Sequence, residues 1–235
     1  MNDYSSDWID TFLTTIDPAQ TQREVALLQR QLPRDRFGRV VDICCGLGRH
    51  SGALAALGYS TTGIDRDATL IAKARRANPH VQFVTMDARG IETLDQQFDA
   101  AICMWQSFGY LERAGNDRLL SGISKTLRPG GCFVLDIYNR KFFEPRQGVL
   151  TSNRNGRAIQ ETKAIDGERI RIELIYDGDS MKSDRFDWEI FTVDQIASRA
   201  NAVSLKMIAA CSAFDERAAV SDSVPRMQVV FEKTG

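Results

Sequence analysis

The chain has 235 residues, 43% of them hydrophobic, and its 30 basic and 31 acidic side chains nearly cancel. This length suits one large domain or a domain with an inserted cap, and the charge balance argues against bulk nucleic-acid binding, which needs phosphate neutralisation. No apolar run approaches the roughly 18 residues of a membrane span, the polar N-terminus is unlike a signal peptide, and the five cysteines include no Cys-x-x-Cys pair. We therefore expect a cytoplasmic protein without a metal site or disulfide frame.

The chain begins with a polar and aromatic arm, residues 1–16, before the first predicted helix. Asp17 and Pro18 are a typical N-cap and first helical residue, and apolar residues then recur on one helical face. We expect a helix over residues 18–32, within an N-terminal segment of residues 1–37.

The most informative stretch follows this helix. An apolar strand-like run carries Asp42 near its end, the turn Gly46-x-Gly48 leads into a helical pattern, and a second strand-like run ends in Asp65. This order is typical of a nucleotide-binding α/β site with an acid for the ribose. A dehydrogenase fingerprint needs glycine or alanine where the chain has Ser51. Because a carboxylate at position 42 repels a pyrophosphate but attracts an ammonium or sulfonium group, the pattern favours a cationic nucleoside over NAD.

Strands and helices continue to alternate, as in a parallel sheet. Asn116 is a candidate N-cap, and residues 128–131, Arg-Pro-Gly-Gly, predict a turn. The expected elements are a helix over 67–77, a strand over 81–84, a buried strand over 98–103, a helix after Asn116 and a strand over 132–137.

The pattern changes after the fifth strand. Residues 158–165 and 168–176 alternate polar and apolar side chains around Asp166-Gly167, a strong hairpin signal, and a third alternating run contains Phe186 and Trp188. We interpret residues 141–191 as an inserted antiparallel β cap. The core then resumes, with a capping box at Thr192 and Gln195 and strands near 203–210 and 227–233.

The segment from Asp42 to Gly48, followed by Arg49 and His50, resembles the first motif of class I S-adenosylmethionine-dependent methyltransferases, with Cys44 in place of the usual glycine. The resemblance continues, in the correct order, through residues 58–65, 81–88, 98–103 and 127–131. It implies a Rossmann-like, seven-stranded α/β sheet with helices on both faces, formed by residues 38–140 and 192–235.

The resemblance also implies roles for individual residues. Asp42 would contact the amino group of the methionine part, Asp65 would accept both ribose hydroxyls, and Asp87 would bind the adenine amino group. Arg49, at the start of a helix, could hold the cofactor carboxylate. The expected cofactor-binding residues are Asp42, Cys44, Cys45, Gly46, Gly48, Arg49, Asp65, Arg66, Asp87, Ala88, Met104, Trp105 and Phe108.

The acceptor side is predicted from aromatic and polar residues near the same sheet edge. Trp105 and Phe108, after the fourth strand, could pack on the adenine or on the sulfonium side. The expected substrate-binding residues are Trp8, Tyr110, Tyr138 and Asn139. No nucleophile–base triad is visible. The catalytic candidates are His50, Tyr110 and Tyr138, and His50 is the candidate for a general base.

The predicted function is transfer of a methyl group from S-adenosylmethionine to N, O or C of a small molecule by in-line displacement. A protein methyltransferase and a non-catalytic module that binds S-adenosylmethionine are the alternatives. A nucleic-acid methyltransferase is disfavoured because Cys103-Met104-Trp105-Gln106 stands where an Asn/Asp-Pro-Pro-aromatic motif would be expected. We expect a monomer or homodimer without nucleic-acid or membrane partners.

Overall fold

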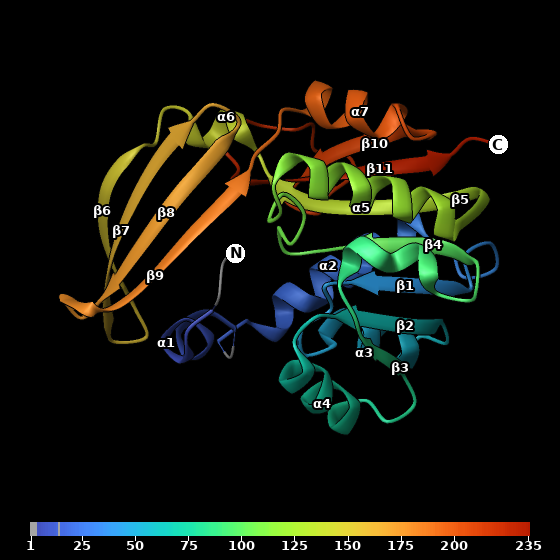
Figure 1. Cartoon of the computed structure of the whole chain (residues 1–235), viewed down its shortest axis with the longest axis horizontal. Helices are drawn as coiled ribbons and strands as arrows, with labels where there is room; N and C mark the ends of the chain where they lie inside the picture. Colours follow the sequence, from blue (N-terminus) through green and yellow to red (C-terminus); the bar gives the residue numbers. More distant parts are fainter. Residues whose placement is uncertain (1–3, 14) are drawn as a thin grey trace.

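The computed structural model describes residues 4–13 and 15–235. At its centre lies a seven-stranded sheet (Figure 1), which in spatial order contains β10 (Leu205–Ser212), β11 (Arg226–Lys233), β5 (Leu127–Tyr138), β4 (Phe98–Cys103), β1 (Arg39–Ile43), β2 (Ser60–Asp65) and β3 (Gln82–Thr85). The five strands β5, β4, β1, β2 and β3 run parallel, whereas β11 and β10 are antiparallel to their neighbours. The predicted Rossmann-like α/β fold is confirmed.

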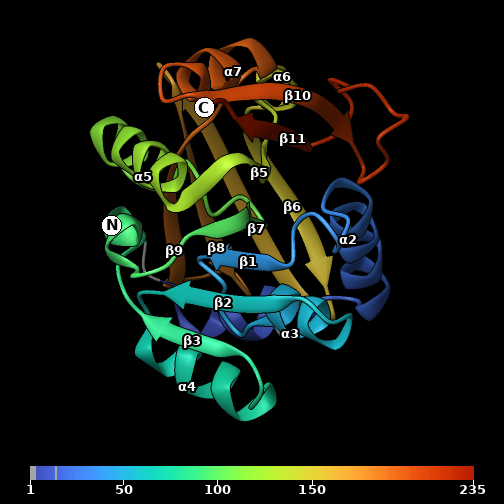
Figure 2. The ribbon, with the colours of Figure 1, turned by 90° about the vertical axis from the view of Figure 1, so that its right-hand side faces the viewer.

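Helices cover both faces of this sheet, and Figure 2 shows α2 and α5 on opposite sides of the strands. Each face of the sheet has its own hydrophobic core. Val40 packs in the core that includes residues of α2, and its neighbour Val41 packs in the core that includes residues of α5. Parallel strands buried on both faces need this continuous apolar character. The covering helices are α2 (Pro18–Gln31), α3 (Arg49–Ala56), α4 (Ala68–Ala77), the short 3₁₀ helix η2 (Ala88–Thr93), α5 (Arg113–Thr126) and α7 (Val193–Asn201).

Two predicted helix starts are confirmed and one is wrong. Asp17 accepts a hydrogen bond from the backbone N of Ala19, and Thr192 and Gln195 form the expected capping box. Asn116 does not cap α5, which begins three residues earlier. Asn116 is instead buried inside the first turns of the helix, where its amide donates to a distant carboxylate.

The turn predicted over residues 128–131 lies inside β5, which is longer than expected. Gly130 has a φ of 71°, and the pairing of β5 with β4 shifts register between Phe98 and Ala100. A glycine tolerates this left-handed conformation without a steric penalty. The segment therefore bends the strand and does not precede it.

A second, four-stranded antiparallel sheet is inserted after β5 and the short helix α6 (Arg140–Phe143). Its strands, in order, are β6 (Gly148–Arg154), β7 (Arg157–Asp166), β8 (Arg169–Tyr176) and β9 (Asp179–Glu189). The sequence predicted three of these strands and missed β6. Figure 1 shows this sheet standing beside the ends of the central strands.

The N-terminal arm docks on the inserted sheet through α1 (Ser6–Trp8) and the π-helical turn η1 (Ile9–Leu13). The hydroxyl of Ser5 donates to Asp184 Oδ2 at 2.7 Å, and Asp7 forms an ion pair with Arg157. Trp8 packs edge-on against the ring of Phe186, 6.2 Å between centroids. The arm and the inserted sheet therefore form one wall that faces the large sheet.

Candidate active site

A cavity of about 840 Å³ lies where the parallel strands end, with the inserted sheet and the N-terminal arm as its other walls. Open α/β sheets bind ligands at this edge, outside the carboxyl ends of their strands. Most of the residues expected from the sequence line this cavity, namely Trp8, Asp42, Cys44, Cys45, Gly46, Arg49, His50, Asp65, Arg66, Asp87, Ala88, Met104, Trp105, Tyr110 and Tyr138.

Three expected site residues, Gly48, Phe108 and Asn139, lie outside the cavity lining. Phe108 was assigned to the cofactor, but it is buried in the core and packs against Phe191 with ring centroids 5.7 Å apart. Asn139 was assigned to the substrate, but its amide donates to the Ser221 carbonyl at 2.9 Å and its Oδ1 caps α6 at Lys141. Both residues support the walls of the cavity from behind.

The two glycines after β1, Gly46 and Gly48, have different structural roles. Gly46 has a φ of 53°, and a Cβ placed there would meet no atom within 4 Å, so its backbone lies open to the cavity. Gly48 has a φ of 72°, and a Cβ there would lie 2.6 Å from the ring of Phe83. Gly48, although expected to bind the cofactor, is outside the cavity lining and permits close packing behind the loop.

Asp42 braces this loop from the end of β1. Its Oδ2 accepts hydrogen bonds from the backbone N of Ser51 at 3.1 Å and from the Ser51 hydroxyl at 2.6 Å. Burial raises the pKa of Asp42, and the nearby His50 and Arg49 oppose that rise. A cationic ligand in the cavity would stabilise the ionised carboxylate further.

The carboxylates of Asp65 and Asp87 also form hydrogen bonds within the loops that carry them. Asp65 accepts from the backbone N of Gly46 through Oδ2 and from that of Asp67 through Oδ1, both at 2.9 Å. Since an ionised carboxylate has about four lone-pair sites, capacity remains toward the cavity. Asp87 forms an ion pair with Arg89 at 2.6 Å, and the hydrogen bond from Arg89 lowers the pKa of Asp87.

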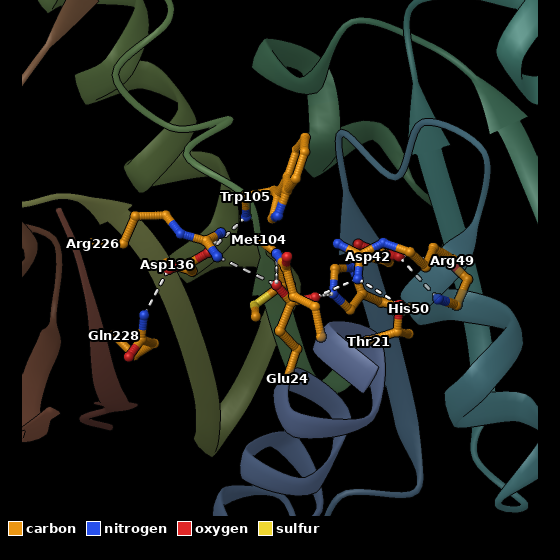
Figure 3. A network of polar contacts seen from close by, with 12 residues as sticks. Thr21, Glu24, Asp42, Arg49, His50, Met104, Trp105, Asp136, Arg226 and Gln228 are labelled. Carbon is orange, nitrogen blue, oxygen red and sulfur yellow. Dashed lines mark hydrogen bonds and ion pairs between the residues drawn. The ribbon is translucent and has the colours of Figure 1, made fainter. Parts of the chain in front are cut away.

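Beneath the cavity lies a buried set of charges, which we call the Glu24 network (Figure 3). Glu24, completely buried on α2, contacts His50 Nε2 at 2.9 Å, Arg226 Nη2 at 3.5 Å and the guanidinium of Arg49. Asp136, completely buried in β5, pairs with Arg226 Nη1 at 2.7 Å. Arg49 and His50, expected to bind the cofactor carboxylate and to act as a base, are therefore engaged by Glu24.

The pKa of Glu24 reflects these partners. Burial alone would raise the pKa, but the hydrogen bond and charge of His50, together with the charge of Arg49, outweigh it and lower the pKa to about 2. Burial raises the pKa of Asp136, and the charge of Arg226 opposes that rise. The network thus places two carboxylates among three basic side chains at the floor of the cavity.

The sequence analysis missed Glu24, Asp136 and Arg226, although two of them left a signal. Glu24 lies four residues before Leu28, on the apolar face of its helix, where a charge is unexpected. Asp136 interrupts an otherwise apolar buried strand. Charged residues in such positions are almost never fully buried unless they are paired, so each predicts a partner.

The residues after β4 have an unusual backbone conformation. Trp105 and Gln106 have φ values of 61° and 50°, and strain of this kind is concentrated at binding sites. Asp136 accepts hydrogen bonds at 2.9 Å from the backbone N of both residues, through Oδ2 and its carbonyl. The guanidinium groups of Arg49 and Arg226 lie 5.7 and 5.9 Å from the Trp105 ring, which is thereby fixed at the cavity wall.

Tyrosines line the cavity where the large sheet meets the insertion. The hydroxyl of Tyr110 accepts a hydrogen bond from Arg66 Nη2 at 2.5 Å. Burial raises the pKa of Tyr138 to about 12 and also raises the pKa of Tyr4. Tyr138 is therefore a neutral phenol near pH 7, suited to hydrogen bonding and not to removing a proton.

Residues 40–131 match a family model described as a methyltransferase domain. The chain is 31% identical over 107 residues to the putative methyltransferase YqeM of Bacillus subtilis, which covers 43% of each chain. It is 28% identical over 156 residues to the dTDP-3-amino-3,6-dideoxy-alpha-D-glucopyranose N,N-dimethyltransferase of Streptomyces fradiae, which covers 64% of this chain and 60% of that protein. The chain thus spans between 43% and 60% of the length of these relatives.

The fold is also found in a solved structure of similar size. The amino pentose methyltransferase CalS10 of Micromonospora echinaspora, solved with S-adenosylmethionine bound, superposes with a TM-score of 0.73 at 20% identity, covering 100% of this chain and 99% of CalS10. The motif order, the sheet order and the family model agree. By its fold, this chain is similar to the class I, Rossmann-like methyltransferases, and residues 40–131 match a methyltransferase-domain model.

Proposed function

We propose that the protein transfers a methyl group from S-adenosylmethionine to a small-molecule acceptor. One observation carries this proposal: a single cavity joins the loop at Gly46 and the acids Asp42, Asp65 and Asp87 to a second region lined by the inserted sheet. The first region suits a cationic nucleoside, because three carboxylates and an open glycine backbone meet there. The second region provides walls for an acceptor.

The residues present fit the cofactor in a specific way. Asp65 would accept the ribose hydroxyls, Asp87 would accept the adenine amino group, and Asp42 would attract the methionine ammonium through its negative charge. The backbone at Gly46 would allow close approach, because no side chain intervenes there. The bound cofactor supplies an activated methyl group on its sulfonium.

The protein's own contribution would be alignment and exclusion of water. In-line displacement needs the nucleophile and the methyl carbon to be held in line, and such positioning can supply a large part of the rate enhancement. Trp105, fixed between two arginines, and the neutral phenol of Tyr138 are placed to orient the reactants. The inserted sheet and the arm would close the acceptor side against solvent.

A small acceptor is favoured over a protein or nucleic acid. The net charge of −1 offers no general attraction for phosphate, and the inserted sheet adds a wall to the cavity beside the cofactor loops. Both an amino sugar methyltransferase and an amino pentose methyltransferase are among the similar proteins, which supports a small polar acceptor.

The location and the assembly belong to the same proposal. All five cysteines are free, which suits a reducing compartment such as the cytoplasm. Among the described residues, no helix is both long and apolar enough to cross a membrane. We propose that the enzyme works as a monomer or homodimer.

Calorimetry tests the cofactor assignment directly. S-Adenosylhomocysteine, the product that the reaction would release, is expected to bind with a dissociation constant in the micromolar range, and NADH is expected not to bind. The physical reason is the acid at position 42, which repels a pyrophosphate and attracts an ammonium group. Micromolar binding of NADH without binding of S-adenosylhomocysteine would overturn the proposed function.

A further inference from the structure

The part of the cavity built by the inserted sheet contains polar groups that the cofactor assignment does not use. Glu161 and Lys163 project into it from β7, among aromatic side chains of β9 and α6. Trp188 Nε1 and Gln106 Oε1 are buried and have no hydrogen-bond partner. Buried polar atoms without a partner are rare in folded proteins, so both point to a ligand.

Glu161 contributes the only carboxylate that the inserted sheet brings to the described cavity lining. Lys163 Nζ lies 2.7 Å from Glu161 Oε2, and both side chains are partly exposed to the cavity, by 15% and 26%. A carboxylate has two oxygens and about four acceptor sites, so one ammonium partner does not exhaust it. The pair can therefore share a further hydrogen-bond donor.

Gln106 brings a second acceptor to the same region. It follows β4, at the sheet edge where the cofactor loops meet, and its Oε1 has no partner. Gln106 donates a hydrogen bond to the Tyr138 hydroxyl, and Tyr138 lines the same cavity as Glu161. Glu161, from the inserted sheet, and Gln106, from the loop after β4, thus face one cavity.

Two hydrogen-bond acceptors in one cavity favour one kind of nucleophile over another. A hydroxyl group has one hydrogen to donate, whereas a primary amine has two and keeps its lone pair for attack. We propose that the acceptor is a small amine, with its N–H groups held by the Glu161 carboxylate and Gln106 Oε1. This inference rests on the proposed function and names the substrate class of that site.

The proton balance assigns a further role to Glu161. The amine lone pair forms the new N–C bond while the C–S bond breaks and its electron pair returns to sulfur, leaving a neutral thioether. The immediate product is a methylated ammonium, which must lose one proton to become a neutral amine. The Glu161 carboxylate accepts a hydrogen bond from that ammonium, which releases the proton to water.

Sinefungin tests this arrangement without a known acceptor. In this cofactor analogue a carbon that bears an ammonium replaces the sulfur with its methyl group, so the ammonium faces the groups that would contact the acceptor nitrogen. Calorimetry would compare sinefungin with S-adenosylhomocysteine. The wild type is expected to prefer sinefungin, and Glu161→Gln is expected to weaken sinefungin binding about tenfold while leaving S-adenosylhomocysteine unchanged.

Two further variants sharpen the comparison. Gln106→Met keeps an unbranched side chain but removes the acceptor, and should weaken sinefungin about threefold. Glu173→Gln is the matched control, because Glu173 pairs with the exposed Arg185 on the other face of the inserted sheet. Unchanged sinefungin affinity in Glu161→Gln, with the protein folded, would overturn the inference and leave the cofactor assignment intact. If the wild type does not bind S-adenosylhomocysteine, both the inference about the acceptor and the cofactor assignment are overturned.

Discussion

Replacing Glu24 with alanine is expected to lower the free energy of unfolding by about 3–5 kcal/mol, because it leaves buried basic groups without their counter-charge. Glu24 is completely buried, and Arg49, His50 and Arg226 all contact it. Urea unfolding of the wild type and the variant at pH 7 measures the change. A loss below about 1 kcal/mol would show that water or a side-chain shift replaces the carboxylate without difficulty.

Glu216→Ala is the matched control for this substitution. Glu216 pairs with Arg30, and Arg30 lies on the same helix as Glu24. Both side chains of this pair are exposed, so the expected loss is much smaller than that of Glu24→Ala. The contrast between the two variants isolates burial, since each removes one glutamate that pairs with an arginine.

The network also predicts a dependence of stability on pH. The pKa of Glu24 falls from its ordinary value of 4.5 to about 2 on folding. A carboxylate with a lowered pKa stabilises the folded state fully above pH 4.5, and that stabilisation is lost as the pH falls toward 2. Glu24→Ala should therefore lose less stability than the wild type between pH 5 and pH 2, as read from urea unfolding at each pH.

The cofactor side of the fold was predictable because its signals are local. Asp42 near the end of its strand, the turn at Gly46 and the acid at Asp65 follow one another within 24 residues, and each is dictated by neighbours in the chain. Parallel strands then bring their carboxyl ends to one edge by topology alone, which is why distant loops could be assigned to one site.

The Glu24 network could not be predicted in the same way. Glu24 lies 25 residues from Arg49 and 202 residues from Arg226, and only the finished sheet brings them together. Asn116 was misread for the same reason. The sequence near Asn116 suggested a helix start, but Asn116 lies inside α5 and its amide donates at 2.7 Å to Glu189, 73 residues away.

The missed strand β6 has a different cause. Every residue of β6 is exposed, including Val149 and Leu150, so the strand shows none of the alternation that burial on one face produces. Its place is fixed by backbone pairing with β7, and none of its side chains is buried. Backbone hydrogen bonds leave no trace in the amino-acid sequence, so an exposed edge strand of this kind escapes pattern analysis.

Replacing Asp65 with alanine is expected to weaken S-adenosylhomocysteine binding by about 2–3 kcal/mol, or roughly 30- to 150-fold. Two effects act in the same direction. The proposed ribose hydroxyls lose a charged acceptor, and the backbone N groups of Gly46 and Asp67 lose the oxygens that hold them at 2.9 Å. Calorimetric titration of wild type and variant with S-adenosylhomocysteine measures the change.

Asp67→Ala separates ligand binding from loop support. Asp67 also lines the cavity, but its carboxylate caps α4 by accepting from the backbone N of Thr69 at 2.7 Å and of Leu70 at 3.0 Å. Its removal should cost about 1 kcal/mol of stability and little affinity. If Asp65→Ala behaves like Asp67→Ala, with lower stability and an unchanged dissociation constant, then Asp65 supports the loop only and the ribose is bound elsewhere. A large loss of affinity in Asp65→Ala alone would assign the ribose to its carboxylate, because the two acids lie two residues apart and share the same loop.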